Sequence, residues 1–201
     1  PLWGVKDGVC ECPKGKNCTS PGKHPHGGLA PHGRNSATRD INVVKRRFAV
    51  YPNLNLACAT GPESGCAVLD IDPRNGGNES LAKLTEKYGP LPVNTGGGGL
   101  HIYFECPDAP LKSREIAPGL DLKAEGGMVN LPPSTHKSGR SYEWQRPLNG
   151  TPFAPVPDWL LSLASTRKQT ATNGVELSSK SGFREGERNN GLTSLAGALR
   201  N

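Results

Sequence analysis

Residues 66–72, Cys-Ala-Val-Leu-Asp-Ile-Asp, constrain the fold more than any other stretch of this chain. A short apolar run bounded by a Gly- and Pro-containing turn on one side and Asp-Pro on the other predicts a buried strand. Side chains alternate along a strand, so Asp70 and Asp72 share one face. Two carboxylates on one face repel each other unless a positive group lies between them, and divalent cations prefer oxygen ligands. The stretch therefore predicts a metal site at the end of a core strand.

Asp72 also has a second interpretation. Asp72-Pro73 and the Asn-Gly-Gly of residues 75–77 are turn formers, so Asp72 can simply begin the turn that ends the strand. This interpretation leaves Asp70 unexplained, because Asp70 follows an apolar run and precedes Ile71.

A second predicted strand carries His101 between Leu100 and Ile102, directly after the four glycines 96–99. Glycines let backbone N–H groups approach an anion closely. Together with the carboxylates, this pattern favours phosphate chemistry. The alternative is a flexible hairpin loop followed by a structural, hydrogen-bonded histidine.

Asp121 lies in Gly-Leu-Asp-Leu-Lys, residues 119–123, which alternates like a third strand. It is a candidate third metal ligand. The alternative for this residue is an exposed strand acid paired with Lys123.

Three thiols and an imidazole occur within fifteen residues at Cys10, Cys12, Cys18 and His24. Zinc is held tetrahedrally by such sulfur and nitrogen ligands, and a short loop with few apolar residues gains order from a bound metal. We therefore expect a structural zinc site, with His26 and His32 as alternative fourth ligands. The alternative is a disulfide or free thiols, although three thiols leave one over. The other cysteines lie in apolar, strand-like contexts and are expected to be buried packing residues: Cys58, Cys66 and Cys106.

The net charge of +6 favours an anionic partner, and nucleic acid is the commonest one. Lys23 is placed to reach a phosphate, although surface lysines are commonly just solvated. Trp144 is a candidate for stacking on a base, with core packing as the alternative. No run of about 18 apolar residues and no signal-peptide pattern occurs, so we expect no membrane span.

The periodicities predict a mixed α/β chain. A helix is expected at 40–50 with Asp40 as its N-cap, a second at 79–88 capped by Asn78, and a short third at 157–165. The expected strands are 54–60, 66–71, 92–95, 100–105, 119–123, 127–131 and 140–145.

The composition divides the chain into three parts. Residues 1–165 are long enough for one domain with its own core, and they include the Cys/His loop at about 8–36. Residues 166–181 are polar and predict a linker, and 182–201 predict the start of a further helical region. The chain opens at Pro1 without Met, so we expect a piece of a longer protein.

Several of these stretches, in this order and spacing, resemble the primase–polymerase domains of the archaeo-eukaryotic primase superfamily, which occur in replication proteins of plasmids, phages and mobile elements. The matching stretches are residues 22–25, 55–61, 68–72, 76–77, 95–104, 119–121, 132–134 and 142–144.

The resemblance implies an RRM-like catalytic core with a small second α/β unit and a zinc-binding loop insertion. It implies that Asp70, Asp72 and Asp121 hold Mg²⁺ or Mn²⁺ and that His101 contacts the phosphates of the incoming nucleotide. Further nucleotide contacts are expected from Lys23, Thr95, Gly97, Gly98 and Ser134. The C-terminal helical region resembles one that often leads into a helicase domain.

The implied activity is template-directed nucleotidyl transfer from nucleoside triphosphates on single-stranded DNA, in the cytoplasm, with two divalent ions. Two rivals stay open on the sequence: a zinc-stabilised single-stranded DNA-binding module without catalysis, and a metal-dependent nuclease, because paired acids serve both chemistries. The preference for ribo- or deoxynucleotides and the preferred metal are not encoded in any recognisable motif.

Overall fold

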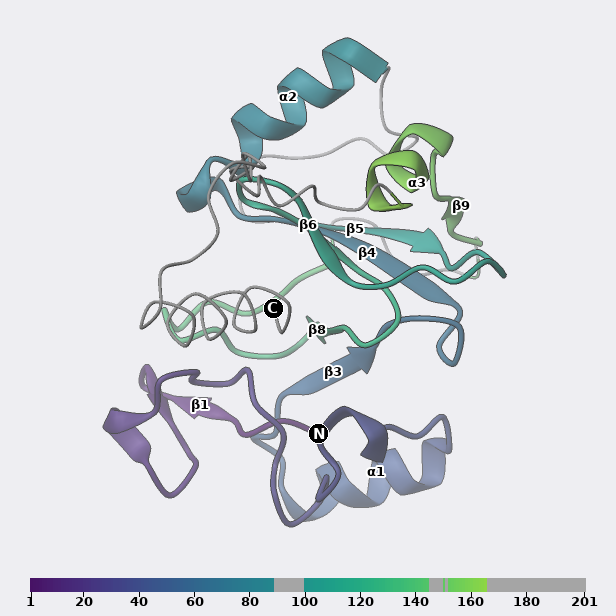
Figure 1. Cartoon of the computed structure of the whole chain (residues 1–201). Helices are drawn as coiled ribbons and strands as arrows, with labels where there is room; N and C mark the ends of the chain where they lie inside the picture. Colours follow the sequence, from purple (N-terminus) through teal and green to yellow (C-terminus); the bar gives the residue numbers. More distant parts are fainter. Residues whose placement is uncertain (89–99, 145–149, 151, 166–201) are drawn as a thin grey trace, which may run out of the picture. The chain divides into compact units, whose positions relative to one another are not determined.

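The computed structural model describes residues 1–88, 100–144, 150 and 152–165 (Figure 1). They lie within one compact unit, Pro1–Thr166. The strand predicted at 92–95 lies outside the described residues, as do the predicted linker and C-terminal helical region.

A mixed five-stranded sheet with the order β6-β7-β4-β5-β9 forms the larger layer of this unit. Strand β4 lies at its centre and pairs antiparallel with β5 on one side and β7 on the other. Strand β6 continues the sheet antiparallel to β7, and β9 runs parallel to β5. The strands are β4 (Cys66–Ile71), β5 (Leu100–Glu105), β6 (Arg114–Ala117), β7 (Leu120–Lys123) and β9 (Ala154–Pro155).

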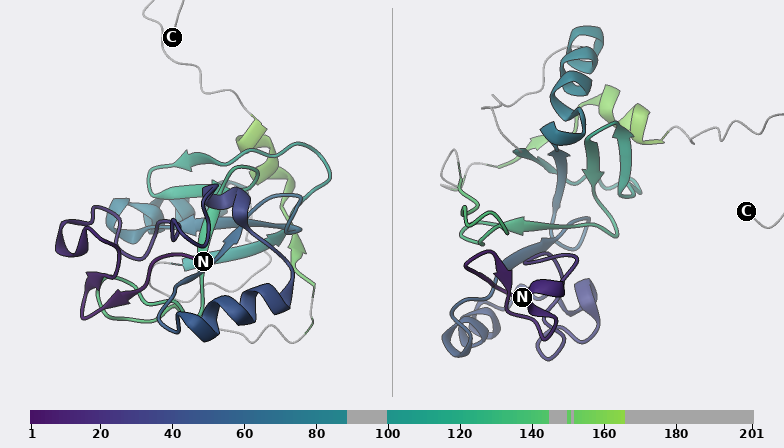
Figure 2. Two further views of the ribbon diagram at one scale, coloured as in Figure 1. Left: turned by 90° about the horizontal axis from the view of Figure 1, so that it is seen from below. Right: turned by 90° about the vertical axis from the view of Figure 1, so that its left-hand side faces the viewer.

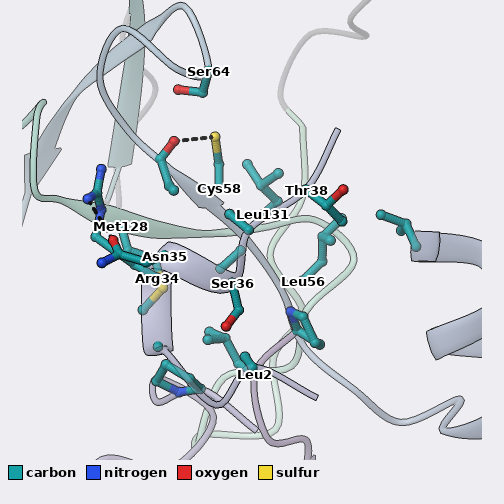
Figure 3. Close-up of a pocket in the computed structure, with 18 of the residues that line it drawn as sticks. Leu2, Arg34, Asn35, Ser36, Thr38, Leu56, Cys58, Ser64, Met128 and Leu131 are labelled. Atoms are coloured by element: carbon teal, nitrogen blue, oxygen red, sulfur yellow. Dashed lines mark hydrogen bonds between the residues drawn. The ribbon is translucent and has the colours of Figure 1, made fainter. Parts of the chain in front are cut away.

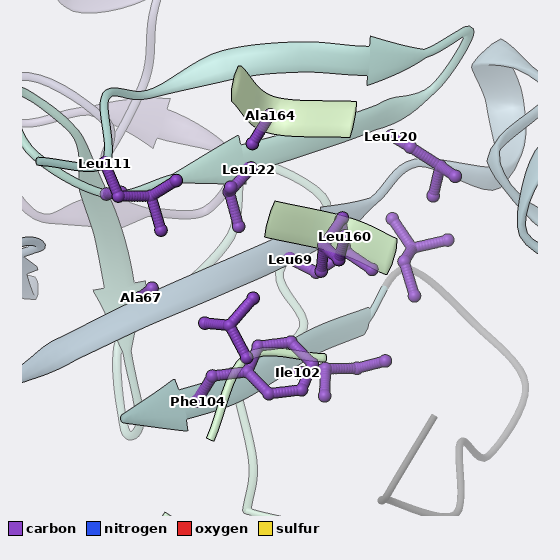
Figure 4. Packing of buried hydrophobic residues seen from close by; sticks show 12 residues of the cluster. Ala67, Leu69, Ile102, Phe104, Leu111, Leu120, Leu122, Leu160 and Ala164 are labelled. Carbon is purple, nitrogen blue, oxygen red and sulfur yellow. The ribbon is translucent and has the colours of Figure 1, made fainter. Parts of the chain in front are cut away.

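One face of this sheet is the hydrophobic core (Figure 4). Alternate residues of the three middle strands are buried there, together with Leu160 of helix α3 (Asp158–Ser165), and the set from the strands is Leu69, Ile71, Ile102, Phe104, Leu120 and Leu122. Helix α2 (Gly77–Tyr88) adds Leu81 and Leu84 to the edge of the same cluster. The alternation that buries these residues directs Asp70, His101 and Asp121 to the opposite face.

Helix α2 begins earlier than the sequence suggested. Asn78 was expected to be its N-cap, but Asn78 lies inside the helix, which starts at Gly77. Gly77 donates its N–H to the carbonyl of Asp72 at 3.0 Å, and the N–H of Asp72 donates to the carbonyl of Gly119 at 2.8 Å. A Cβ at Gly77 would lie 2.5 Å from the Gly119 oxygen, so the close approach of two backbones determines where the helix starts.

A second group of elements packs beside the sheet and includes the N-terminal segment (Figure 2). Strands β3 (Leu56–Ala59) and β8 (Met128–Leu131) form an antiparallel ladder. Helix α1 (Ile41–Val50) begins after Asp40, whose side chain accepts from the N–H groups of Asn42 and Val43, so the predicted N-cap is confirmed. The remaining short elements are β1 (Val5–Lys6), β2 (Val9–Cys10) and the 3₁₀ turns η1 (Gly15–Asn17), η2 (Gly33–Ser36) and η3 (Pro73–Asn75).

The strand expected at 140–145 is wrong for the part the structure describes. Residues 140–144 contain one isolated bridge, between Thr135 and Ser141. The His136 N–H donates to the Arg140 carbonyl and Gly139 has a φ of 81°, so this segment closes on itself as a tight turn and has no neighbouring strand to extend along.

Within the described residues, we find no helix with the length and apolar character that a membrane crossing needs.

Candidate functional site

Strand register brings three predicted site residues into one row, which we call the acid row: Asp70, His101 and Asp121. Asp70 on β4 lies directly opposite His101 on β5 and directly opposite Asp121 on β7. Residues that lie opposite each other across a sheet are close on the same face, here the face away from the core. Residues separated by up to 51 positions in the sequence are therefore neighbours because three alternating strands pair in this register.

Two like charges opposite each other destabilise a sheet, and here each carboxylate has its own side-chain partner. Nε2 of His101 lies 3.5 Å from Oδ1 of Asp70, and Nζ of Lys123 lies 3.1 Å from Oδ2 of Asp121. Burial by itself would raise the pKa of Asp70. The His101 ring outweighs it, with weaker contributions from the charges of Lys123 and Lys23, so the pKa of Asp70 falls below its ordinary value.

Asp72 begins the turn η3, as its second interpretation predicted. Its carboxylate accepts from Nε and Nη2 of Arg74, both at 3.0 Å, and from Nδ2 of Asn75 at 2.9 Å. The paired Arg74 guanidinium holds the pKa of Asp72 below its usual range. A turn former can also be a metal ligand, so the two interpretations of Asp72 are compatible.

A positive patch next to the acid row was not predicted as a group. Lys23 lowers the pKa of Asp70. Burial is the main cause of the lowered pKa of His136, and the charges of Lys23, Arg74 and Lys137 add to it. Charges from three segments that are distant in the sequence therefore act on His136, and one of them, Lys23, also acts on Asp70. The only sequence signal for Arg74 was its position two residues after Asp72, and His136 had none.

Aromatic rings cover one side of the row. Tyr142 stacks on His101 with ring centroids 6.0 Å apart and meets His136 edge-on at 6.2 Å. Trp144 lies 5.2 Å from Tyr103, which also contacts Phe153 at 5.6 Å. Trp144 therefore contacts the ring of Tyr103 and is half-buried, and base stacking by Trp144 stays a prediction.

A buried amide positions Lys23. Nδ2 of Asn55 donates to the carbonyls of Gly22 and Thr135 at 3.1 and 2.8 Å, and Nδ2 of Asn130 also donates to Gly22 at 2.9 Å. These bonds tie the Cys/His loop to β8 and to the turn that carries His136. Sequence reasoning missed both asparagines, because their partners lie at least 33 positions away.

Ser134 is buried and exchanges hydrogen bonds with the backbone N–H and carbonyl of Leu56, at 2.8 and 2.9 Å. A nucleotide contact by Ser134 stays a prediction. Thr95, Gly97 and Gly98 lie outside the described residues.

The predicted zinc ligands come together as a set. Nε2 of His24 lies 3.5 Å from Sγ of Cys10 and 3.4 Å from Sγ of Cys18, and these atoms and Sγ of Cys12 all lie within 4.8 Å of one another. In a tetrahedral site with Zn–S near 2.3 Å and Zn–N near 2.0–2.1 Å, nitrogen and sulfur ligands are about 3.5 Å apart. The four side chains thus have the number, chemistry and spacing of a zinc site.

In the described part of the chain, the Cys/His set is the one group of three or more metal-ligand atoms gathered this closely. His26 is not part of it and stacks on Trp3 at 3.9 Å. The carboxylates of Asp70, Asp72 and Asp121 are not gathered to this degree, and each is paired with another side chain. All six cysteines are free thiols, and Cys58 and Cys66 approach to 3.6 Å between their sulfurs.

The comparisons with known proteins identify a family. The family model described as bifunctional DNA primase/polymerase, N-terminal (Prim-Pol), matches residues 4–159, which include the acid row and the Cys/His set. Neither the comparison with curated proteins nor that with solved structures gives a match.

Proposed function

Because the chain belongs to the bifunctional DNA primase/polymerase family, whose members are nucleotidyltransferase-type enzymes acting on DNA and nucleotides, we propose that it makes primers and extends them on a single-stranded DNA template. The observation that carries this proposal is the acid row. Two carboxylates and a histidine, brought together by cross-strand register, face away from the core and next to a positive patch.

The acids fit a divalent metal. Asp70 and Asp121 are like-charged neighbours that need counter-charge, and a hard cation can take over this role from their side-chain partners Lys123 and His101. We propose that Asp70, Asp72 and Asp121 hold Mg²⁺ or Mn²⁺. The chemistry such ions supply is activation of a 3′-hydroxyl and neutralisation of the charge on the triphosphate and the departing pyrophosphate.

The chain's own cations would bind the triphosphate. Nε2 of His101 points toward Asp70 on the face that carries the acid row. Once Asp70 binds a metal, Nε2 can donate a hydrogen bond to a phosphate oxygen instead. Lys23 and Arg74 add positive charge near Asp70 and favour an anionic substrate. Positioning and electrostatics of this kind supply most of the acceleration in phosphoryl and nucleotidyl transfer.

We also propose that Cys10, Cys12, Cys18 and His24 hold a structural zinc ion. Lys23 directly precedes the ligand His24, so the metal would order the segment that brings Lys23 to the acid row.

The larger assignments follow from the family. We infer that the sheet with α2 and α3 corresponds to the RRM-like catalytic core, that residues 1–165 form the catalytic domain, and that 166–181 link it to a helical region and a helicase domain in a longer cytoplasmic protein.

Activity on unprimed DNA tests the proposal. Protein, single-stranded DNA, nucleoside triphosphates and Mg²⁺ or Mn²⁺ should yield new oligonucleotides on a denaturing gel. Asp70→Asn should reduce the product by at least about 10³-fold with the fold retained, because the carboxylate is needed only for the metal and the charge balance of the row. Asp108→Asn makes the same change on an exposed loop acid and should leave synthesis unchanged.

Two outcomes would reject the proposal. Shortening of the DNA without added triphosphates would indicate a nuclease. Tight DNA binding that is independent of Asp70, with neither primer synthesis nor extension of a supplied primer, would indicate a binding module.

A further inference from the structure

A groove of about 550 Å³ lies away from the acid row (Figure 3). It runs between the ladder β3–β8 on one side and the segment from η2 into α1 on the other. Its volume is within the range of about 300–1,000 Å³ that is typical of ligand sites. None of the acid-row residues lines it, so it has no part in the chemistry proposed above.

The floor of the groove is apolar. Leu56, Met128 and Leu131 of the ladder line it, and Val44 and Phe48 of α1 lie half-buried along its wall. Apolar surface of this kind suits the face of an unpaired base, whose edges stay in water.

The rim of the groove has unmatched positive charge. Arg34 is held in place, since it donates to the carbonyls of Gly127 and Thr60, both at 3.3 Å, and lies 3.7 Å from the groove's one acid, Glu63. Arg39 and Arg47 also line the groove, and in the described part of the chain neither guanidinium has a hydrogen-bond or ion-pair partner. Two guanidiniums are therefore available to an anionic ligand.

From these observations we propose that this groove holds a segment of the single-stranded DNA, with successive phosphates on Arg39 and Arg47 and bases against the apolar floor. The inference rests on the proposed function, because it names where that activity's DNA strand is held outside the catalytic centre.

The spacing of the arginines favours a strand over a free nucleotide. Arg39 lies just before α1 and Arg47 lies in its second turn, a separation on the order of 10 Å along the helix axis. The phosphates of a triphosphate share bridging oxygens and lie closer together than this. A duplex is disfavoured because its bases are stacked inside and cannot reach the floor.

The salt dependence of DNA binding tests the proposal. Binding of the chain to a fluorescent single-stranded oligonucleotide is measured over a range of salt concentrations. Each phosphate contact on single strands contributes about 0.7 to the slope of log K against log salt, so Arg39→Gln/Arg47→Gln should lower its magnitude by about 1.4. Arg39→Lys/Arg47→Lys, which keeps both charges, should restore most of it.

Lys45→Gln/Arg46→Gln is the matched control. It removes the same amount of charge at two exposed residues of α1 that do not line the groove, and it should change the slope less. An equal loss of slope in both double variants, or no loss in Arg39→Gln/Arg47→Gln, would overturn the proposal.

A second arm tests the floor. An abasic oligonucleotide of the same length should bind the wild type at least about fivefold more weakly with the same salt slope, because stacking is lost and the phosphates remain. Equal binding of the two oligonucleotides would overturn the proposal that bases lie against the apolar floor. If Arg39→Gln/Arg47→Gln weakened binding of a free nucleoside triphosphate and left oligonucleotide binding unchanged, the occupant would be a nucleotide and the proposal would be rejected.

Primer synthesis by the wild type, measured in parallel, separates the two proposals. If Arg39→Gln/Arg47→Gln lowers the salt slope but the wild type makes no primers, the groove proposal is retained and the polymerase proposal is rejected. If the wild type makes primers but the slope of the variant is unchanged, the polymerase proposal is retained and the groove proposal is rejected.

Discussion

At the scale of single residues, the site is a balance of charges drawn from distant segments. His101, Lys123 and Lys23 lower the pKa of Asp70, and the neighbouring Arg74 lowers the pKa of Asp72. The acids were visible in the sequence because alternation within a short strand exposes them. His136 and the buried Asn55 were not, because the partners of each are brought near only by tertiary structure.

His136 gives a direct test of this balance. Its pKa is lowered by burial first and then by neighbouring positive charges, Lys23 the foremost. Lys23→Gln removes a charge that disfavours the imidazolium, so the pKa of His136 should rise toward its ordinary value of about 6.5. An NMR titration of the ring protons measures it. Lys16→Gln, the same change in the same loop, should leave it unmoved, and an unmoved His136 in Lys23→Gln would show that Lys23 does not reach the site.

Cys58 and Cys66 are the second residue-scale case. Their sulfurs lie 3.6 Å apart, and hydrogen bonding from Cys58 lowers the pKa of Cys66 to about 6. A thiolate at neutral pH next to a thiol should oxidise readily, so glutathione disulfide should join the pair while itself being reduced to two glutathione molecules.

Mass spectrometry can detect this bond without ambiguity. No Lys or Arg lies between Phe48 and Arg74, so one tryptic peptide carries both of these cysteines and no others. It should become lighter by about 2 Da, the two hydrogens lost, and resist alkylation. Cys106→Ser should still form the bond, whereas a glutathione adduct on a single cysteine of the wild type would contradict the expectation.

At the scale of elements, the middle strands and helix α1 were predictable, and their local signals explain why. Residues 66–71 and 100–105 alternate apolar and polar positions or run apolar between turns, and Asp40 has a capping side chain with a basic helix behind it. The start of α2 and the turn at 134–142 were not predictable, because backbone approaches between distant segments determine both.

The contact between Gly77 and Gly119 is such an approach. Gly119 has a φ of 71°, and a Cβ there would lie 2.5 Å from the Gly77 nitrogen. Gly119→Ala should lower the free energy of unfolding by about 2–4 kcal/mol through backbone strain and overlap together. Gly126→Ala is matched, with a φ of 82° and no atom within 4 Å, and should cost about 1–2 kcal/mol. Urea denaturation measures both, and equal losses would mean that the approach contributes nothing.

At the scale of the whole molecule, the Cys/His set and the acid row belong to one system. Asn55 and Asn130 hold Gly22 by hydrogen bonds, Lys23 follows it and acts electrostatically on Asp70, and His24 of the set comes next in the chain. The family could be recognised from motif order, but the physical connection between its motifs required the fold.

Zinc removal tests this connection. A zinc chelator, or Cys18→Ser, should lower the Tm by several degrees, since about 1 kcal/mol shifts the Tm by roughly 2–4 °C in a domain of this size. It should also weaken binding of nucleoside triphosphates, because Lys23 loses its position. Cys106→Ser should change neither quantity. A lower Tm with unchanged nucleotide affinity would show that the Cys/His loop stabilises the fold without contributing to nucleotide binding at the acid row.

The register of β4 has a consequence for how the chain can fail. Leu69 and Ile71 face the main core while Asp70 lies between them on the other face, so removing one in-frame codon from the strand would exchange the faces of the residues beyond the deletion. The carboxylate of Asp70 would then point into the main core, and Leu69 or Ile71 would leave it. A deletion within β4 should therefore leave no working form of the domain. An activity assay on a library of single-codon deletions would report correct strand pairing as directly as it reports catalysis.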